Sequence, residues 1–307
     1  MESDGSEPLL IFMYMIIHIG IFVLIFETIR NCLAAKRVQA VLIAFLILFS
    51  RPMLFSLERG NTIIFTMLMT AVFLFNYDSD NEVRREIAII CLALSAVFKI
   101  TPAILGVLLL TDKRNIKLAL RAVLYGIIAF GVPFFFLKDN PIRSAQQLIT
   151  NIQLNLDAYG RWSGVTLEAC LTSIGLHMDG TIMTIVKYVL CAFLVFSAFF
   201  VQEKWKKVMM ISLVLVTVPN HSGYYCILYM IPSFVLFLKE KEHTAVDWLI
   251  LLPVLSTLIP HLNIFTANYL RTEICVLILI IMMVFYTILE IDKKRKNGMN
   301  RKLVAAI

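Results

Sequence analysis

The chain has 307 residues, of which 60% are hydrophobic and 16% are charged, and its formal net charge at pH 7 is +7. Soluble domains contain about half apolar residues and about a quarter charged residues, so this composition excludes an ordinary soluble domain. The positive charge does not indicate a nucleic-acid partner, because the basic residues stand beside long apolar segments, as they do in membrane proteins.

Apolar segments follow one another along the whole chain. Backbone groups in the hydrocarbon core of a bilayer have no water to bind, so each segment is expected to be a helix. The segments are residues 9–29, 38–50, 62–77, 87–98, 102–111, 118–137, 181–201, 208–218, 224–238, 245–260 and 272–291. We therefore predict an all-α polytopic membrane helix bundle of about 11 spans, formed by a single transmembrane domain over residues 1–307.

The basic residues indicate how these segments are oriented. When the segments alternate in direction, the loops on one face and the C-terminal tail carry twenty lysine and arginine residues, whereas the opposite face carries seven. The positive-inside rule places the more basic face in the cytoplasm, and with it the C-terminus. Only Lys187, which lies within a segment, belongs to neither face.

Two pairs of segments are predicted to form short helical hairpins. Residues 87–111 are broken at Lys99–Pro102, and residues 208–238 are broken at Pro219–Gly223. A lysine at the bilayer midplane would cost at least about 2.5 kcal/mol, and proline removes a helix donor and disfavours helix at the residue before it. The alternative, one continuous span for each pair, would also move two basic clusters to the outer face. Both turns are therefore expected on the outer side, below the membrane surface.

Four polar segments are expected to face outward together. They are Arg51–Asn61, the turn at Lys99, the turn Asn220–Tyr225 and an outward-facing loop over residues 138–180. Broken helices at membrane depth occur where they line a cavity, so the pattern predicts one polar outward-facing cavity. Within the long loop, residues 145–156 have the amphipathic spacing of a helix lying in the membrane interface, although a plain surface helix has the same spacing.

The segment Arg51–Asn61 contains the densest group of polar candidates. Glu58, Arg59 and Asn61 stand between two apolar segments, and Gly60 permits a tight turn. Arginine offers a forked set of donors that suits phosphate, and asparagine or glutamate can bind sugar hydroxyls. A solvated loop with an internal ion pair is the alternative interpretation.

The two turns supply the other candidates. Lys99 would present a positive charge to a phosphate in the cavity, or would extend its ammonium group to the lipid headgroups. His221 followed by Tyr224 and Tyr225 is typical of a site for a phosphate and a sugar ring, but a structural histidine beside interfacial tyrosines gives the same pattern.

A series of short motifs follows in order along the chain: Arg51-Pro52, Leu57–Asn61, Ala93–Ala96, Phe98–Pro102, Leu108–Leu110 and Lys113-Arg114. Taken in this order, they resemble glycosyltransferase family 87, the GT-C membrane enzymes typified by polyprenyl-phosphate-mannose-dependent α-1,2-mannosyltransferases. The clear part of the resemblance covers roughly residues 50–125, and the turn Pro219–Tyr225 is similar to the polar turn that precedes a late span in this family.

The resemblance implies a GT-C fold and a sugar transfer in the plasma membrane of a bacterium, with the active side outward. Mannose or another hexose would move from a polyprenyl-phosphate donor to a lipid or glycan acceptor, with membrane lipids as further partners. Arg59, Lys99 and His221 would stabilise the leaving phosphate, and Asn61, Tyr224 and Tyr225 would hold the sugar or the acceptor. The sequence has neither a nucleotide-binding motif nor a cluster of metal-ligating residues, so no cofactor and no metal site are expected.

The resemblance does not extend to the residue that acts as the general base. In the family a catalytic aspartate stands in a large outer loop that follows one or more further spans, and no aspartate of this chain matches it. The resemblance therefore implies that the N-terminal part is lacking. Glu58, Asp157 and Glu168 are the outward carboxylates, of which Glu58 is taken as the candidate base.

Two other functions stay open. A transporter or flippase of a lipid-linked sugar also has broken helices around a central polar site, although the two turns here share no sequence that would indicate an internal repeat. The expected lack of the N-terminal part favours a noncatalytic remnant or partner of a glycan-assembly complex.

Overall fold

The computed structural model describes residues 7–32, 37–112, 115–136, 140–159, 164–259 and 267–304, and every regular element in these ranges is helical. The elements are α1 (Glu7–Cys32), α2 (Arg37–Leu48), α3 (Arg51–Glu58), α4 (Ile63–Asn76), α5 (Glu82–Phe98), the 3-10 helix η1 (Thr101–Gly106), α6 (Val107–Leu110), α7 (Ile116–Gly131), η3 (Val132–Phe136), α8 (Pro141–Tyr159), α9 (Leu167–Thr172), α10 (Gly180–Ser197), α11 (Lys204–Thr217), η4 (Tyr224–Met230), α12 (Ile231–Lys239), α13 (Ala245–Leu258) and α14 (Ala267–Val304).

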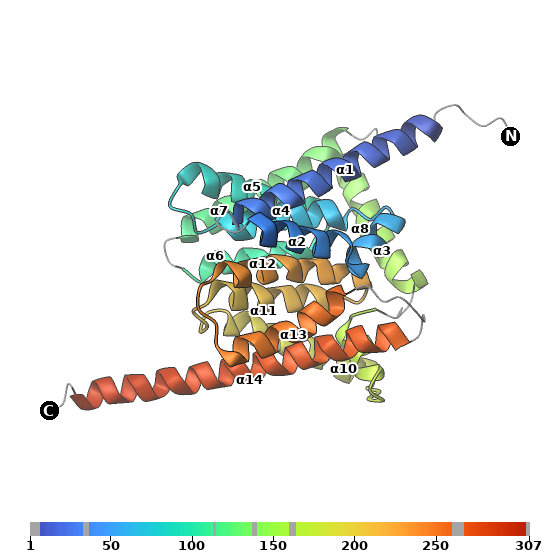
Figure 1. Ribbon diagram of the computed structural model, residues 1–307. Coiled ribbons are helices and arrows are strands. Elements are labelled where there is room, and N and C mark those ends of the chain that lie inside the picture. Colours follow the sequence, from blue (N-terminus) through green and yellow to red (C-terminus); the bar gives the residue numbers. More distant parts are fainter. Residues whose placement is uncertain are drawn as a thin grey trace.

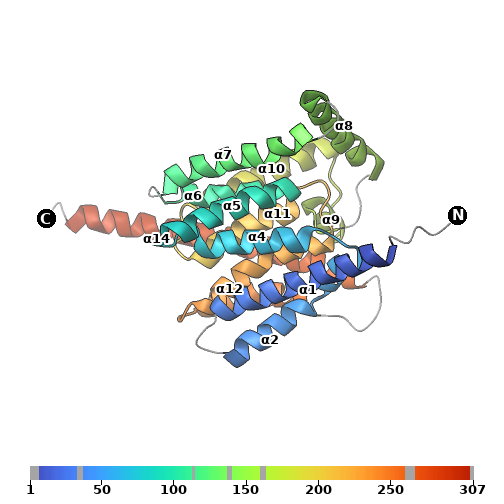
Figure 2. The same ribbon diagram turned by 90° about the horizontal axis from the view of Figure 1, so that it is seen from above.

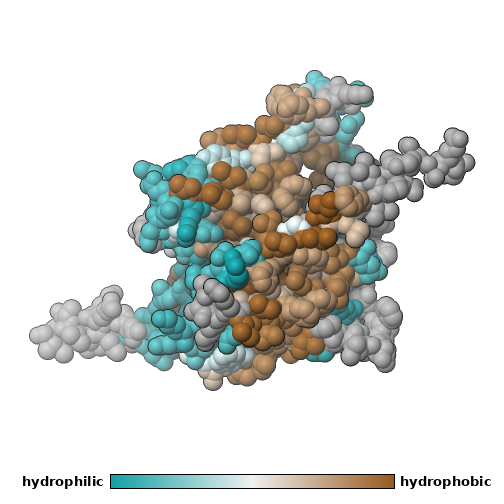
Figure 3. Space-filling view, turned by 45° about the horizontal axis from the view of Figure 1, so that its top comes forward, coloured by the Kyte–Doolittle hydropathy of each residue, from teal (hydrophilic) through white to brown (hydrophobic). Residues whose placement is uncertain are grey.

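The long helices lie side by side in a bundle, and α14 continues beyond the body of the bundle at one end (Figures 1 and 2). An apolar band crosses the molecule between two hydrophilic ends (Figure 3). Three helical stretches are long and apolar enough to cross a membrane, namely Ile116–Phe136, Gly180–Ser197 and Leu270–Lys296. The pair α2 and α3, bent by 50°, adds a fourth if it counts as one span. The chain is therefore an integral membrane protein with a helical fold.

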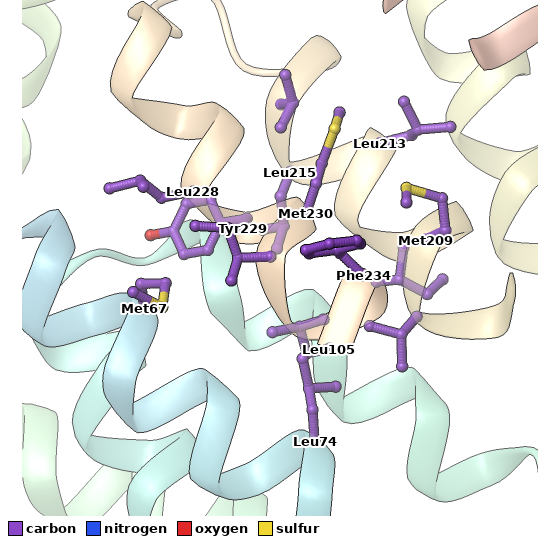
Figure 4. Close-up of a cluster of buried hydrophobic side chains, with 14 of the residues drawn as sticks. Met67, Leu74, Leu105, Met209, Leu213, Leu215, Leu228, Tyr229, Met230 and Phe234 are labelled. Carbon is purple, nitrogen blue, oxygen red and sulfur yellow. The ribbon is translucent and has the colours of Figure 1, made fainter. Parts of the chain in front are cut away.

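Helix α11 forms the centre of the bundle. From Val208 to Thr217 every residue is buried, as expected for a segment that is apolar all round. Helix α11 packs against η4 and α12 of its own hairpin, against η1 of the other hairpin and against α10, so the core holds the two hairpins together. These side chains belong to one buried apolar cluster that also includes residues of α4. Figure 4 shows part of this cluster: Met209, Leu213 and Leu215 of α11 with Leu228, Tyr229, Met230, Phe234, Met67, Leu74 and Leu105.

The predicted chain reversal at Lys99 is confirmed. After this residue, η1 and α6 lead the chain back, and Asp112 lies close enough to Tyr77, at the far end of α4, to interact with it electrostatically. Helix α7 then starts beside the start of α5, where Arg121 and Glu86 form an ion pair of 2.8 Å. The segment from η1 to α6 is therefore a short returning arm between α5 and α7.

The second predicted reversal, at Pro219–Gly223, is confirmed as well. Ser212 of α11 donates a hydrogen bond of 2.8 Å to the carbonyl oxygen of Tyr229, and Ser233 donates one of 2.6 Å to that of Trp205. Between these two bonds the residue number rises in α11, from Trp205 to Ser212, and falls in the other arm, from Ser233 to Tyr229. This is the pattern of antiparallel neighbours. Helix α11 and the arm formed by η4 and α12 therefore lie side by side in opposite directions.

Residues 51–58 were expected to belong to a loop, but they form the helix α3. Pro52 stands in the first turn of this helix, where its missing N–H leaves no bond unmade. Gly60 follows with a φ of 57°, the left-handed conformation that glycine adopts most easily, and so makes the predicted tight turn. A helix of eight residues is marginal alone, so its contacts with the rest of the fold stabilise it.

Two helices occupy the described part of the long loop. Helix α8 includes the predicted amphipathic segment 145–156 and extends it at both ends, and it lies at an angle to the long helices at one end of the bundle (Figure 2). The short helix α9 was not predicted. Lys138, Arg161, Trp162 and Ser163 lie outside the described residues, as do the side chains of Asn155, Asp157 and Tyr159.

The end of the bundle away from Lys99 contains a buried ionic network. Lys206, which is only 2% exposed, lies 2.7 Å from Asp247 and 3.1 Å from Glu203. Tyr286 donates its hydroxyl proton to Glu203, and Asp247 also caps α13 together with Thr244. This network joins α11, α13 and α14 at one end of the molecule.

Candidate functional site

Residues from three distant parts of the chain meet at the end of the bundle where both hairpins turn. The Nζ atom of Lys99 lies 4.6 Å from the ring centroid of Tyr225, and Phe55 of α3 stacks on the same ring with the centroids 6.3 Å apart. The side chain of Asn61 hydrogen-bonds with Tyr225. Three of the four segments that were predicted to share a cavity are therefore neighbours in the fold.

One face of α3 is directed toward η4. Arg51 lies 5.7 Å from the ring centroid of Tyr224, and Phe55, one turn later, faces Tyr225. Glu58 follows Arg51 by seven residues, which returns it to the same face of the helix, and it is exposed. This spacing places an accessible carboxylate at the rim of the candidate site.

Arg59 lies at the same rim. Its guanidinium carbon is 4.4 Å from the ring centroid of Phe55, and the residue is exposed. An arginine that stacks on an aromatic ring keeps its donors in a defined plane, which suits the recognition of a phosphate.

Lys99 is half-buried, and its ammonium group lies over the ring of Tyr225. Burial disfavours its charged form and lowers the pKa of its ammonium group below the ordinary value, while the neighbouring Cys226 acts in the opposite direction. The face of the Tyr225 ring carries partial negative charge and attracts the ammonium group. Lys99 is thus held in place beside the turn by an aromatic ring, which leaves it available to an anion.

The turn residues point to two sides of the hairpin. His221 is half-buried within the turn, and Tyr225 faces Lys99. Tyr224 instead donates its hydroxyl proton to Glu273 of α14 over 3.1 Å. The predicted set is therefore divided: Tyr225 belongs with Asn61 and Lys99, whereas Tyr224 lies between Arg51 and a buried carboxylate.

Two charged residues near this turn, Lys187 and Glu273, were not singled out from the sequence as site residues. Lys187 of α10 contacts Asn220 and Glu168, and Glu273 accepts the bond from Tyr224. An ionisable residue within an apolar membrane segment is a signal for a functional role, and this signal was present for Lys187 and Glu273. Their partners are distant in sequence, so only the fold shows what they contact.

An apolar groove of about 670 Å³ lies between α5, the returning arm and α7. Small residues keep it open, among them Ala93, Ala96, Gly106, Ala119 and Gly126. Ile100 also lines the groove, and it is the residue that follows Lys99. The groove therefore extends along the hairpin to the position of the candidate cation. Among the described residues, no group of three histidine, cysteine, aspartate or glutamate side chains could hold a metal ion.

A comparison with models of protein families identifies the family of this chain. The model of glycosyltransferase family 87 matches residues 6–219, more than two thirds of the chain. The chain belongs to glycosyltransferase family 87. Comparisons with curated proteins and with solved structures gave no match.

Membership of glycosyltransferase family 87 implies a membrane glycosyltransferase, with a sugar donor and an acceptor as its partners. The matched residues include α3 and the Lys99 hairpin and end at Pro219. His221, Tyr224 and Tyr225 lie beyond them. These three residues join the other candidates through the fold, because the second hairpin places its turn beside the first.

Proposed function

We propose that this family 87 protein transfers mannose or another hexose from a polyprenyl-phosphate donor to a lipid or glycan acceptor at the outer face of a bacterial plasma membrane. The bundle would be of GT-C type, with the eleven apolar segments entering the membrane, the basic end and the C-terminus in the cytoplasm, and the Lys99 end outward. The excess of basic residues at one end supports this orientation.

The observation that carries the proposal is the apolar groove that ends beside Lys99. A polyprenyl phosphate has a long hydrocarbon chain and an anionic headgroup, so it needs an apolar channel within the membrane and a cation at the end of it. The groove has an apolar lining along α5, the returning arm and α7, and Lys99 directly precedes Ile100, one of the lining residues. A nucleotide-sugar donor would not need such a channel.

The candidate residues have complementary chemical roles in this transfer. The acceptor oxygen forms a bond to the anomeric carbon of the sugar, and the bond from that carbon to the phosphate oxygen breaks. Glu58 takes the proton of the acceptor hydroxyl. Lys99, Arg59 and His221 stabilise the charge that develops on the leaving polyprenyl phosphate. Asn61 and Tyr225 bind hydroxyl groups of the sugar or the acceptor, whereas the hydroxyl group of Tyr224 is bonded to Glu273.

The direct test is turnover of the purified protein in lipid vesicles. Polyprenyl phosphates that carry mannose, glucose or galactose are supplied with a membrane lipid extract as acceptor, and released polyprenyl phosphate is measured. We expect release with one of these hexoses and a loss of at least about 100-fold in Glu58→Gln and in Lys99→Ala, the usual range for removing an acid–base or charge-stabilising group.

Lys293→Ala serves as the matched control, because its side chain is 70% exposed on α14 at the other end of the bundle. Turnover that is unchanged in Arg59→Ala, Lys99→Ala and His221→Ala would contradict the assignment of these residues. Movement of intact donor across the vesicle membrane without release of polyprenyl phosphate would instead identify a transporter.

A further inference from the structure

Lys187 is a charged residue in a position that an apolar membrane helix does not favour. It stands seven residues after the start of α10, about 10 Å along the helix axis, and the residue is 7% exposed. Placing an ammonium group at this depth is costly unless a partner compensates for the lost water. The contacts that Lys187 makes therefore indicate why a lysine occupies this position.

Those contacts join α10 to two other segments. The Nζ atom of Lys187 donates a hydrogen bond of 3.3 Å to the side-chain oxygen of Asn220, in the turn of the second hairpin. The same atom lies 3.6 Å from a carboxylate oxygen of Glu168, in the first turn of α9. One cation thus connects the membrane helix, the outer loop and the turn.

The loop also contacts the turn through its backbone. The N–H of Val165 donates a hydrogen bond of 2.9 Å to the carbonyl oxygen of Ser222. A Cβ atom on Gly164 would lie 2.2 Å from that same oxygen, so only glycine permits this approach. On the other side of the turn, Tyr224 is held by its bond to Glu273. The turn is therefore fixed by loop, membrane helix and C-terminal helix at once.

We propose that Lys187 is a positioning residue of the candidate site: its ammonium group, neutralised by Glu168, binds Asn220 and holds the Pro219–Tyr225 turn where His221 and Tyr225 face the donor. A turn of irregular backbone inside the membrane has few regular hydrogen bonds of its own. Its position depends on contacts from outside the hairpin, and Lys187 supplies the ionic one. The effect on transfer rests on the proposed function, whereas the effect on the turn does not.

A native thiol reports on the turn without any assay of activity. Cys226 lies one residue after Tyr225 and is 8% exposed. A variant that keeps Cys226 and carries alanine at the other five cysteines is treated with a thiol reagent in detergent. We expect the modification of Cys226 to be slow, and to become at least about tenfold faster in Lys187→Met, because loss of a buried pair favours local opening.

Three further variants separate positioning from general destabilisation. Lys187→Arg keeps the charge and should restore slow modification to within about threefold. Gly164→Ala disturbs the same turn through the backbone and should accelerate modification as Lys187→Met does. Lys206→Met removes another buried, paired lysine at the far end of the bundle and should leave the modification of Cys226 slow, although the protein becomes less stable.

The kinetic readout is the division of the effect between kcat and KM. A misplaced turn impairs the transition state more than donor binding, so Lys187→Met should lower kcat at least about tenfold with KM changed by less than about threefold. Unchanged modification of Cys226 and unchanged kcat in Lys187→Met would overturn the proposal. Equal acceleration of modification in Lys187→Met and Lys206→Met would also overturn it. Faster modification of Cys226 in Lys187→Met and in Gly164→Ala, but not in Lys206→Met, supports the positioning role even if no hexose donor is turned over.

Discussion

The ammonium group of Lys99 lies 4.6 Å from the ring centroid of Tyr225, although the two residues belong to different hairpins. Each hairpin alone would expose its turn residue to the membrane interface. Packed together around α11, the two turns place a cation on an aromatic ring whose other neighbours are Phe55 and Asn61. This contact defines the centre of the candidate site.

Replacement of Tyr225 by leucine should weaken transfer through the loss of the ring. A cation–π contact is worth about 0.5–2 kcal/mol, so kcat/KM is expected to fall by about 2- to 30-fold. Tyr225→Phe keeps the ring and loses only the bond to Asn61, and should retain most of the activity. A loss in Tyr225→Phe as large as that in Tyr225→Leu would indicate that the hydroxyl group, and not the ring, is required.

As the pH rises, donor binding should begin to weaken at a lower pH than it would with a lysine of ordinary pKa. Burial lowers the pKa of Lys99, so its ammonium group loses its proton, and its attraction for phosphate, as the pH rises through this lowered pKa. The KM for the donor is therefore expected to rise on the alkaline side of its pH profile. In Lys99→Arg the guanidinium group stays charged, so this rise should move to higher pH. The same alkaline rise in both proteins would assign it to another group.

A bulky side chain in the apolar groove should lower kcat/KM more for donors with a long prenyl chain than for donors with a short one. Ala96→Phe introduces a ring into the groove between α5 and α7, so long polyprenyl donors should lose about tenfold or more in kcat/KM, an effect comparable to overpacking a well-filled site. A donor with a short prenyl chain should be affected much less. Ile185→Phe, at an exposed position of α10, is the control. Equal losses for short and long donors would contradict a role of the groove in holding the chain.

The orientation of the bundle can be tested with two positions at opposite ends of α4. Thr62 and Asp80 are both exposed, before and after this helix. In a cysteine-free background, Thr62→Cys should react with a membrane-impermeant thiol reagent on intact cells, and Asp80→Cys should react only after permeabilisation. The reverse result would place the candidate site in the cytoplasm.

The ionic network at the far end should contribute strongly to stability. Lys206→Met leaves Asp247 without its closest cation at a buried position, which typically costs about 3–5 kcal/mol. We expect a clear decrease in the Tm of the purified protein. Lys296→Met removes an exposed pair with Asp292 and should change Tm little. Similar Tm values for the two variants would show that the buried network does not stabilise the fold.

Much of the architecture could be predicted from the sequence, because the membrane imposes it. Apolar segments in a bilayer have to be helical, and the helices in the described residues follow the predicted segments closely. The breaks at Lys99 and Pro219 indicated two hairpins for a local reason, the cost of a lysine or a proline within a continuous span. Arg59, Asn61 and Lys99 became candidates because they are polar residues between apolar segments, and Tyr225 because it follows the polar turn at Pro219–Gly223.

Only the tertiary structure decided which of these residues are neighbours. The helix α3 was not predicted from the sequence, because eight residues form a stable helix only with contacts from elsewhere in the fold. Lys187 was recognisable as a charge within a segment, but its partners Asn220 and Glu168 are far away in the sequence. Helical periodicity specifies which face of a segment is apolar, whereas the packing of side chains around α11 determines which segments meet. The sequence by itself therefore determined a helical membrane protein with polar turns, and the packing of its helices joined two of those turns into one candidate site.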